Sequence, residues 1–200
     1  MSPDAAGELE GIVPASPDRT DPVRARIEAL AKAIRHLHNR GARGELAALR
    51  RMDEARAVEP ALHKLLARAA PDAEFGARLR RDDIGRLALM TKVLALGMSI
   101  ETLGRGHYDL GRMMTDAKIS ERRVQMLMEA RGPAFDDLIL RLSRRLVREG
   151  ALPYLDIGRL VLGSDEMVER TRRRVAKGFW GARAEKEDET AEQTAGGETE

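Results

Sequence analysis

Residues 133–150 read PAFDDLILRLSRRLVREG, and this stretch decides the fold class. Its apolar residues Phe135, Ile139, Leu142 and Leu146 recur at intervals of three and four, the period of an α-helix with one buried face. The proline at its start and the glycine at its end are typical of helix boundaries. The segment therefore predicts a helix with one apolar stripe.

The same spacing occurs in nearly every segment between residues 22 and 181, with little of the alternation that is typical of β-strands. In the first of these segments, Val23, Ile27, Leu30 and Ile34 share one face behind a start at Asp21, a good N-cap residue. The body of the chain is therefore predicted to be all-α, with about eight or nine helices.

The expected organisation is a two-lobed helical bundle. A segment at 97–109 contains several glycines and no helical pattern, so it is predicted to be a loop between an N-terminal lobe (22–96) and a C-terminal lobe (110–181). Both ends are acidic and lack apolar periodicity. We therefore predict that residues 1–21 and 182–200 are disordered acidic segments.

The formal net charge of +2 conceals a segregation of charge along the chain. Residues 1–21 carry −4 and residues 185–200 carry −6, so the chain between them carries +12, almost all of it from arginine. A folded body this basic is typical of a protein with a polyanionic partner, and nucleic acid is the leading candidate.

Composition excludes several classes of function. The absence of cysteine removes disulfides, thiolate nucleophiles and cysteine-based zinc sites, and the four histidines lack the spacing of metal ligands. No apolar run approaches the roughly 20 residues of a membrane span, and the acidic first residues do not resemble a secretion signal. We expect a cytoplasmic protein that is not an enzyme, with no cofactor, no metal and no membrane contact.

The spacing of the arginines is the clearest functional signal. Within 133–150, four arginines stand at i, i+3, i+4 and i+7, opposite the apolar stripe, and a second row with the same spacing runs from Arg170 to Lys177. Hardly any acidic residues are expected on these two stripes, although like charges at i and i+4 repel each other. Guanidinium groups match phosphate oxygens bidentately, so the stripes predict a face that binds a nucleic acid backbone.

The residues predicted to bind nucleic acid are Arg50, Arg51, Arg80, Arg81, Arg112, Arg122, Arg123, Arg141, Arg144, Arg145, Arg148, Arg173, Arg174 and Lys177. Aromatic residues make up only 3% of the chain, too few for a base-stacking platform built on several rings. Binding is therefore expected to be directed at the backbone and largely blind to sequence.

Five segments stand in an order that is similar to a known family. They are GELAALRR (44–51), PALHKLL (60–66), DLGRMMTDAKISERRVQMLMEAR (109–131), DDLILRLSRRLVREG (136–150) and VERTRRRVAKGFWG (168–181). On these motifs the chain resembles the CasB family, the small subunit of the type I-E CRISPR surveillance complex called Cascade. The likeness covers roughly residues 22–181 and leaves the acidic ends outside it.

The resemblance implies a non-catalytic helical subunit in antiviral defence, present as two copies beside the backbone and large subunits of Cascade. Its partners would be guide RNA and target DNA. The family's basic positions correspond to the pairs at 50–51, 122–123 and 144–145 and to Arg112, with a weaker match at 80–81. Two departures are the absence of aromatic residues at Leu62 and His63 and of a tryptophan near Val161.

Two other classes of protein remain as alternatives. A helix-turn-helix regulator would also be helical and basic, but it would read one operator sequence. A helical interaction scaffold would direct its arginines at acidic protein, including its own tail at 185–200.

Overall fold

Helices form all the regular structure in the part of the chain that the computed structural model describes, which comprises residues 21–52, 60–70, 81–97, 109–150 and 152–196. This confirms the predicted all-α class. The helices are α1 (Pro22–Asn39), α2 (Arg43–Arg51), α3 (Pro60–Ala69), α4 (Arg81–Leu96), α6 (Leu110–Asp116), α7 (Glu121–Glu129), α8 (Gly132–Arg148), α9 (Tyr154–Leu162) and α10 (Asp165–Gly196).

The start of α1 follows directly from its sequence. The Asp21 side chain accepts hydrogen bonds from the backbone N–H groups of Val23 at 3.0 Å and of Arg24 at 3.3 Å, which satisfies two of the donors that a helix leaves free at its start. Pro22 occupies the first turn, and the helix is followed by Gly41 at a φ of +70°. The predicted N-cap is therefore confirmed.

The core is built from the apolar stripes that the sequence shows. In α8, Phe135, Ile139, Leu142 and Leu146 are all buried, as the spacing predicts. The buried apolar residues of α1 to α4 and those of α6 to α10 belong to one connected core.

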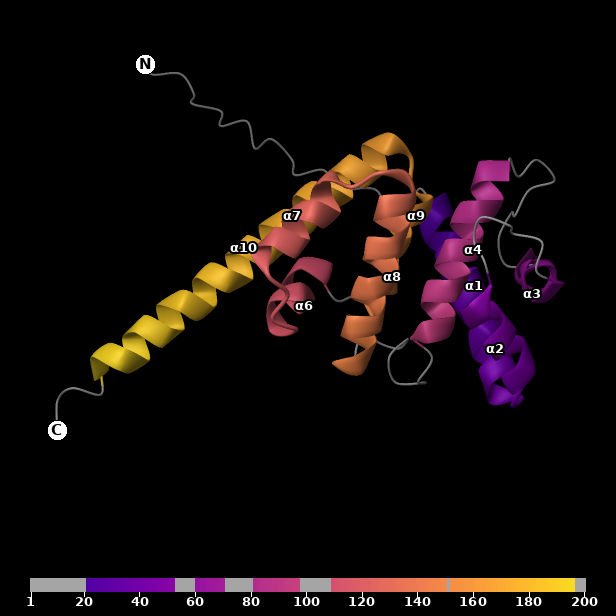
Figure 1. Cartoon of the computed structure of the whole chain (residues 1–200), viewed down its shortest axis with the longest axis horizontal. Coiled ribbons are helices and arrows are strands. Elements are labelled where there is room, and N and C mark those ends of the chain that lie inside the picture. Colours follow the sequence, from indigo (N-terminus) through magenta and orange to yellow (C-terminus); the bar gives the residue numbers. More distant parts are fainter. Residues whose placement is uncertain (1–20, 53–59, 71–80, 98–108, 151, 197–200) are drawn as a thin grey trace, which may run out of the picture.

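Figure 1 shows how the helices are arranged around this core. Helices α1 to α4 lie at one end, α6, α7 and α10 lie at the other, and α8 and α9 lie between them. Helix α9 contacts α1 and α4 on one side and α10 on the other, and α8 contacts both α4 and α7. The two halves of the sequence are thus packed together through α8 and α9, while the division into two lobes stays a prediction.

Helix α10 is longer than its sequence suggested. It was predicted to end near Gly181, with disordered residues from 182 onward, but it continues to Gly196 and spans 32 residues, or about 48 Å. Its far end projects beyond the other helices (Figure 1). Extending a packed helix adds one hydrogen bond per residue without a new nucleation cost, and Arg183 pairs with Glu187 one turn later at 3.0 Å. The acidic composition therefore did not prevent a helix.

The other predicted segment boundaries fall mostly outside the described residues. Of the predicted N-terminal segment 1–21, only Asp21 is described, and of the predicted loop 97–109, only Gly97 and Asp109. Asp109 caps α6, because its side chain accepts a hydrogen bond from the Gly111 N–H at 2.7 Å.

Candidate nucleic-acid interface

The predicted basic row of α8 lies on the exposed side of that helix. Arg141, Arg144, Arg145 and Arg148 are all exposed, opposite the buried apolar stripe. Arg144 and Arg148 make no ion pair or hydrogen bond through their side chains with any described residue. Their guanidinium groups are therefore available to an external anion.

The other two arginines of this row have partners within the protein. Arg141 pairs with Asp137 at 2.6 Å, one turn earlier in α8, and Arg145 pairs with Glu149 at 3.1 Å, one turn later. Arg145 also donates to the Ala117 carbonyl oxygen at 3.4 Å, which places this end of α8 beside the turn between α6 and α7. The α8 row thus alternates between free and paired guanidinium groups.

The basic row of α10 shows the same alternation. Arg173 and Lys177 are exposed and without a side-chain partner among the described residues. Arg170 pairs with Glu166 at 3.1 Å, and Arg174 pairs with Asp156 of α9. The expectation that hardly any acidic residues accompany the two stripes was therefore wrong, because acids one turn away and Asp156 from another helix neutralise part of each row.

Asp156 is the most unusual of these acids because it is buried, with 6% of its surface exposed. Burial raises the pKa of its carboxyl group above the ordinary value, because a low-dielectric environment disfavours the charged form. The N–H of Leu110, at 3.1 Å, and the positive charges of Arg174 and Arg159 act in the opposite direction. Asp156 therefore ties the first turn of α6 and the α10 arginine row to α9.

The pair Arg122 and Arg123 lies in the first turn of α7, and both side chains are exposed without a described partner. Their neighbour Glu121 pairs with Arg183 of α10 at 3.1 Å, so this turn of α7 lies against the middle of α10. At the other end of α7, the Ala130 carbonyl oxygen accepts a hydrogen bond from Arg172 at 2.9 Å. The two helices therefore run antiparallel, side by side, as Figure 1 shows.

The remaining predicted residues are bound within the fold or lie outside its description. Arg50 donates to the Ala95 carbonyl oxygen at 2.7 Å, at the end of α4, and Arg51 donates to the Ala47 carbonyl oxygen at 3.2 Å. Arg112 pairs with Glu185 at 3.5 Å. Arg80 lies outside the described residues, and of Arg81 only its place at the start of α4 is described.

The structure thus separates the predicted set into three groups. The unpaired group is Arg122, Arg123, Arg144, Arg148, Arg173 and Lys177, and we call it the free cation set. Arg112, Arg141, Arg145 and Arg174 are paired with carboxylates. Arg50 and Arg51 bind backbone carbonyl groups. All members of the free cation set come from α7, α8 and α10.

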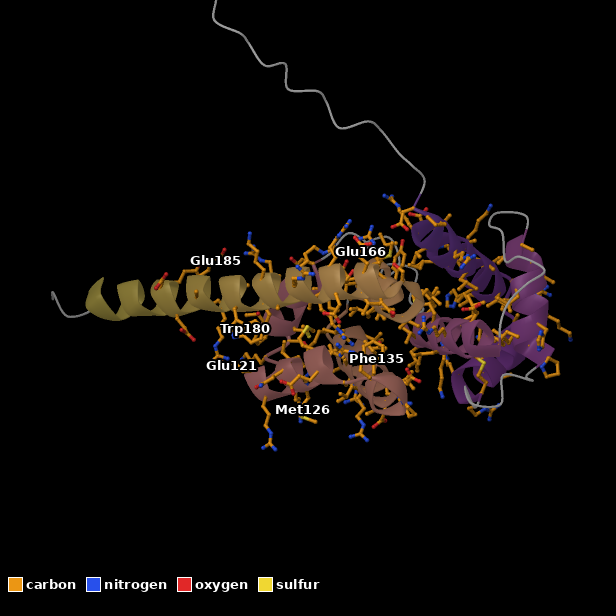
Figure 2. The ribbon with its side chains drawn as sticks, turned by 90° about the horizontal axis from the view of Figure 1, so that it is seen from above. Glu121, Met126, Phe135, Glu166, Trp180 and Glu185 are labelled. Atoms are coloured by element: carbon orange, nitrogen blue, oxygen red, sulfur yellow. The ribbon has the colours of Figure 1, made fainter. Side chains whose placement is uncertain are left out.

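Sequence reasoning missed two side chains near this surface. Trp180, which lies just before the predicted disordered segment 182–200, is 43% exposed in the interior of α10 (Figure 2). Arg172, which lies between members of the α10 row in the sequence, is buried, with its guanidinium 5.8 Å from the centre of the Phe135 ring. Trp180 lies in the interior of α10 because that helix is long, and Arg172 is buried because of how α10 packs. No local sequence pattern indicates either property.

A groove of about 350 Å³ lies between α10 and the turn that joins α6 to α7. Lys118, Ser120, Arg183 and Lys186 line part of it. Its cations are already engaged in part, since Arg183 pairs with Glu121 and Lys186 pairs with Asp116 at 2.8 Å. The groove is therefore a poorer anion site than the free cation set.

The described ranges contain neither a candidate metal site nor a helix suited to crossing a membrane. No cluster of three or more histidine and acidic residues suited to a metal ion occurs there. None of the described helices combines the length and the apolar character that crossing a membrane requires.

Comparisons with known proteins supply no relative: no protein-family model, curated protein or solved structure matches the chain. The candidate interface therefore rests on the geometry of its own residues.

Proposed function

We propose that this protein binds nucleic acid backbones without reading their sequence, as the non-catalytic small subunit of a type I-E CRISPR effector complex. The observation that carries the binding is the free cation set, in which exposed cations on α7, α8 and α10 have no carboxylate partner among the described residues. The three helices that carry the set are neighbours, because α7 contacts both α8 and α10.

The chemistry of this set favours phosphate over base edges. All but one of its members are arginines, whose planar guanidinium groups bind phosphate oxygens through two parallel hydrogen bonds. Contacts to phosphates hold a nucleic acid in place but carry no sequence information. The expected ligand is therefore any nucleic acid strand, whatever its sequence, because every strand carries phosphate groups.

The assignment to Cascade rests on the resemblance of the five sequence segments to the CasB family. In guide-directed recognition, base pairing reads the sequence, so a protein subunit need only neutralise and hold backbones. Under this proposal the partners are guide RNA, target DNA, the backbone and large subunits and a second copy of the chain. The genes that flank this one test the assignment, since neighbours encoding the other Cascade subunits would support it and their absence would count against it.

A charge-matched pair of variants tests the binding face. Arg122→Gln with Arg123→Gln removes two members of the free cation set, whereas Arg43→Gln with Lys64→Gln removes two exposed, unpartnered cations on α2 and α3, at the opposite end of the molecule. We expect the first variant to weaken binding to unrelated DNA duplexes equally. It should also reduce the magnitude of the slope of log K against the logarithm of the salt concentration by about 0.9 for each lost phosphate contact. The measurement is filter binding over a range of salt concentrations.

The second variant is the control, and its affinity and slope should stay close to those of the wild type. Equal losses in both variants would show that binding follows overall charge rather than this face, which contradicts the proposal. A strong preference for one duplex over another would instead favour the helix-turn-helix regulator.

A further inference from the structure

Trp180 is a large aromatic side chain left exposed in the middle of α10, next to the buried Phe179. Its indole meets the ring of Phe179 edge to face, with 5.2 Å between the ring centres and 86° between the ring planes. Phe179 is 1% exposed and fixed in the core, whereas Trp180 keeps 43% of its surface open to solvent. The indole is therefore anchored at the protein surface while part of its ring remains available to a ligand.

Cations flank this ring. Arg173 and Lys177 precede Trp180 by seven and three residues, a spacing that places all three on the same side of α10. Arg183, three residues after Trp180, pairs with Glu121, so the turn of α7 that carries Arg122 and Arg123 lies at the level of this ring. In Figure 2, Trp180 of α10 and Glu121 of α7 lie at about the same level along the axis of α10. An exposed indole thus stands between two parts of the free cation set.

We propose that Trp180 stacks against an unpaired base of a single-stranded nucleic acid whose phosphates are held by Arg173, Lys177 and the start of α7. This inference rests on the proposed function and adds a preference for single strands to it. Proteins that bind single strands combine aromatic stacking with a cationic path for the backbone, and stacking tolerates any base because every base has a π-face. In a duplex the faces of internal bases are covered by their neighbours, so the ring would not reach them.

A protein partner fits this surface less well. Among the described residues, the large hydrophobic side chains that are exposed are Trp180 and Met126, and Met126 lies on α7 rather than beside the ring on α10. Two separate side chains do not form the contiguous apolar patch that marks a protein interface. On the N-terminal side of the ring, the exposed and unpaired Arg173 and Lys177 complement phosphate.

The test uses the intrinsic fluorescence of Trp180, which is the only tryptophan in the sequence. The full chain is titrated at low salt with a 12-nucleotide oligothymidine and, separately, with a 12-base-pair duplex of mixed sequence. We expect the oligothymidine to quench the emission strongly by stacking and the duplex to bind with little quenching.

Two variants are then compared by the anisotropy of labelled oligonucleotides. Trp180→Ala should weaken binding to oligothymidine about 10-fold and leave duplex binding unchanged, whereas Trp180→Phe should retain most of the affinity. Both variants should keep the helical circular dichroism of the wild type, and Trp180→Ala should lower the melting temperature slightly because it removes the edge-to-face contact with Phe179.

The outcomes separate this inference from the proposed function. Binding of both ligands with no quenching, together with wild-type affinity of Trp180→Ala for oligothymidine, would overturn the stacking site and leave the proposed function intact. Equal losses of single-strand and duplex binding in Trp180→Ala would also overturn it. Failure of the wild type to bind either ligand would overturn both proposals. A fluorescence change that depends on protein concentration without nucleic acid would assign the ring to a second copy of the chain and overturn the stacking site.

Discussion

Gly111 sets how closely α6 can approach α10. A methyl group at this position would overlap the Val175 carbonyl oxygen and the Phe179 backbone nitrogen of α10, so only glycine fits. In the sequence, Gly111 follows the glycines at 104 and 106 and superficially resembles part of a phosphate-binding loop. Its role in the structure is helix packing, and this packing supports the segment of α10 that presents Lys177 and Trp180.

Gly111→Ala should therefore destabilise the protein. The added methyl group meets rigid backbone rather than a movable side chain, and we expect a loss of about 2–4 kcal/mol in the free energy of unfolding, measured by urea denaturation. The control is Gly181→Ala, where nothing lies within 4 Å of the added group and the residue is in the interior of α10. That variant should gain about 0.5–1 kcal/mol, because alanine favours the helix. Equal stability of the two variants would show that α6 does not pack on α10 in this way.

At the scale of the element, the two halves of α10 differ in packing and in charge. Its first half buries Thr171, Val175 and Phe179, while its second half is acidic and projects beyond the other helices (Figure 1). Ion pairs with α6 and α7 reach as far as Lys186, which pairs with Asp116 at 2.8 Å. In this arrangement α10 carries residues 188–196 away from the basic row on the same helix (Figure 1), and among the described residues the tail pairs with the predicted arginines only through Glu185 and Arg112.

Removing residues 188–200 should change the affinity for oligonucleotides but leave the melting temperature almost unchanged. The deletion removes a net charge of −5 but none of the described ion pairs that join α10 to α6 and α7, so the melting temperature should move by less than about 2 °C. Affinity for oligonucleotides should rise at low salt and match that of the full chain at high salt, since the effect is a screened long-range repulsion. Thermal melts and binding titrations measure the two quantities. A melting temperature lowered by 10 °C would show that the acidic end packs against the folded body.

At the scale of the whole molecule, the contacts that join the two halves of the sequence determine how it unfolds. Ile27 of α1 is fully buried, and it packs so closely on Gly158 of α9 that a methyl group at 158 would overlap its side chain. Helix α9 in turn contacts α10. A destabilising change in α1 should therefore also shift the unfolding transition that Trp180 reports, although the two sites lie near opposite ends of the chain.

Ile27→Ala should lower the stability of the whole molecule by about 2–4 kcal/mol, because it leaves a cavity in the shared core. Helical circular dichroism and Trp180 fluorescence should report one coincident thermal transition in the wild type and one transition at a lower temperature in the variant. If the fluorescence transition kept its midpoint while the circular dichroism transition split, the predicted division into two lobes would also be a division into two unfolding units.

The sequence by itself determined the helical class, the buried faces and the exposed side of each basic row, because these depend on the 3.6-residue period and on residues one turn apart. It placed Arg144 and Arg148 opposite the apolar stripe of α8, and the structure confirms that placement. The pairing of Arg141 with Asp137 is also one turn long and was readable in principle.

Only the tertiary structure decided which guanidinium groups pair with an acid on another helix. Arg174 is held by Asp156 and Arg112 by Glu185, and these partners lie 18 and 73 positions away in the chain. Trp180 is exposed because α6 and α7 cover other sides of α10 and because that helix continues past its expected end. The physical reason is that a helical period fixes the direction of a side chain relative to its own axis, whereas its charge partners and its exposure depend on which neighbouring helices pack beside it.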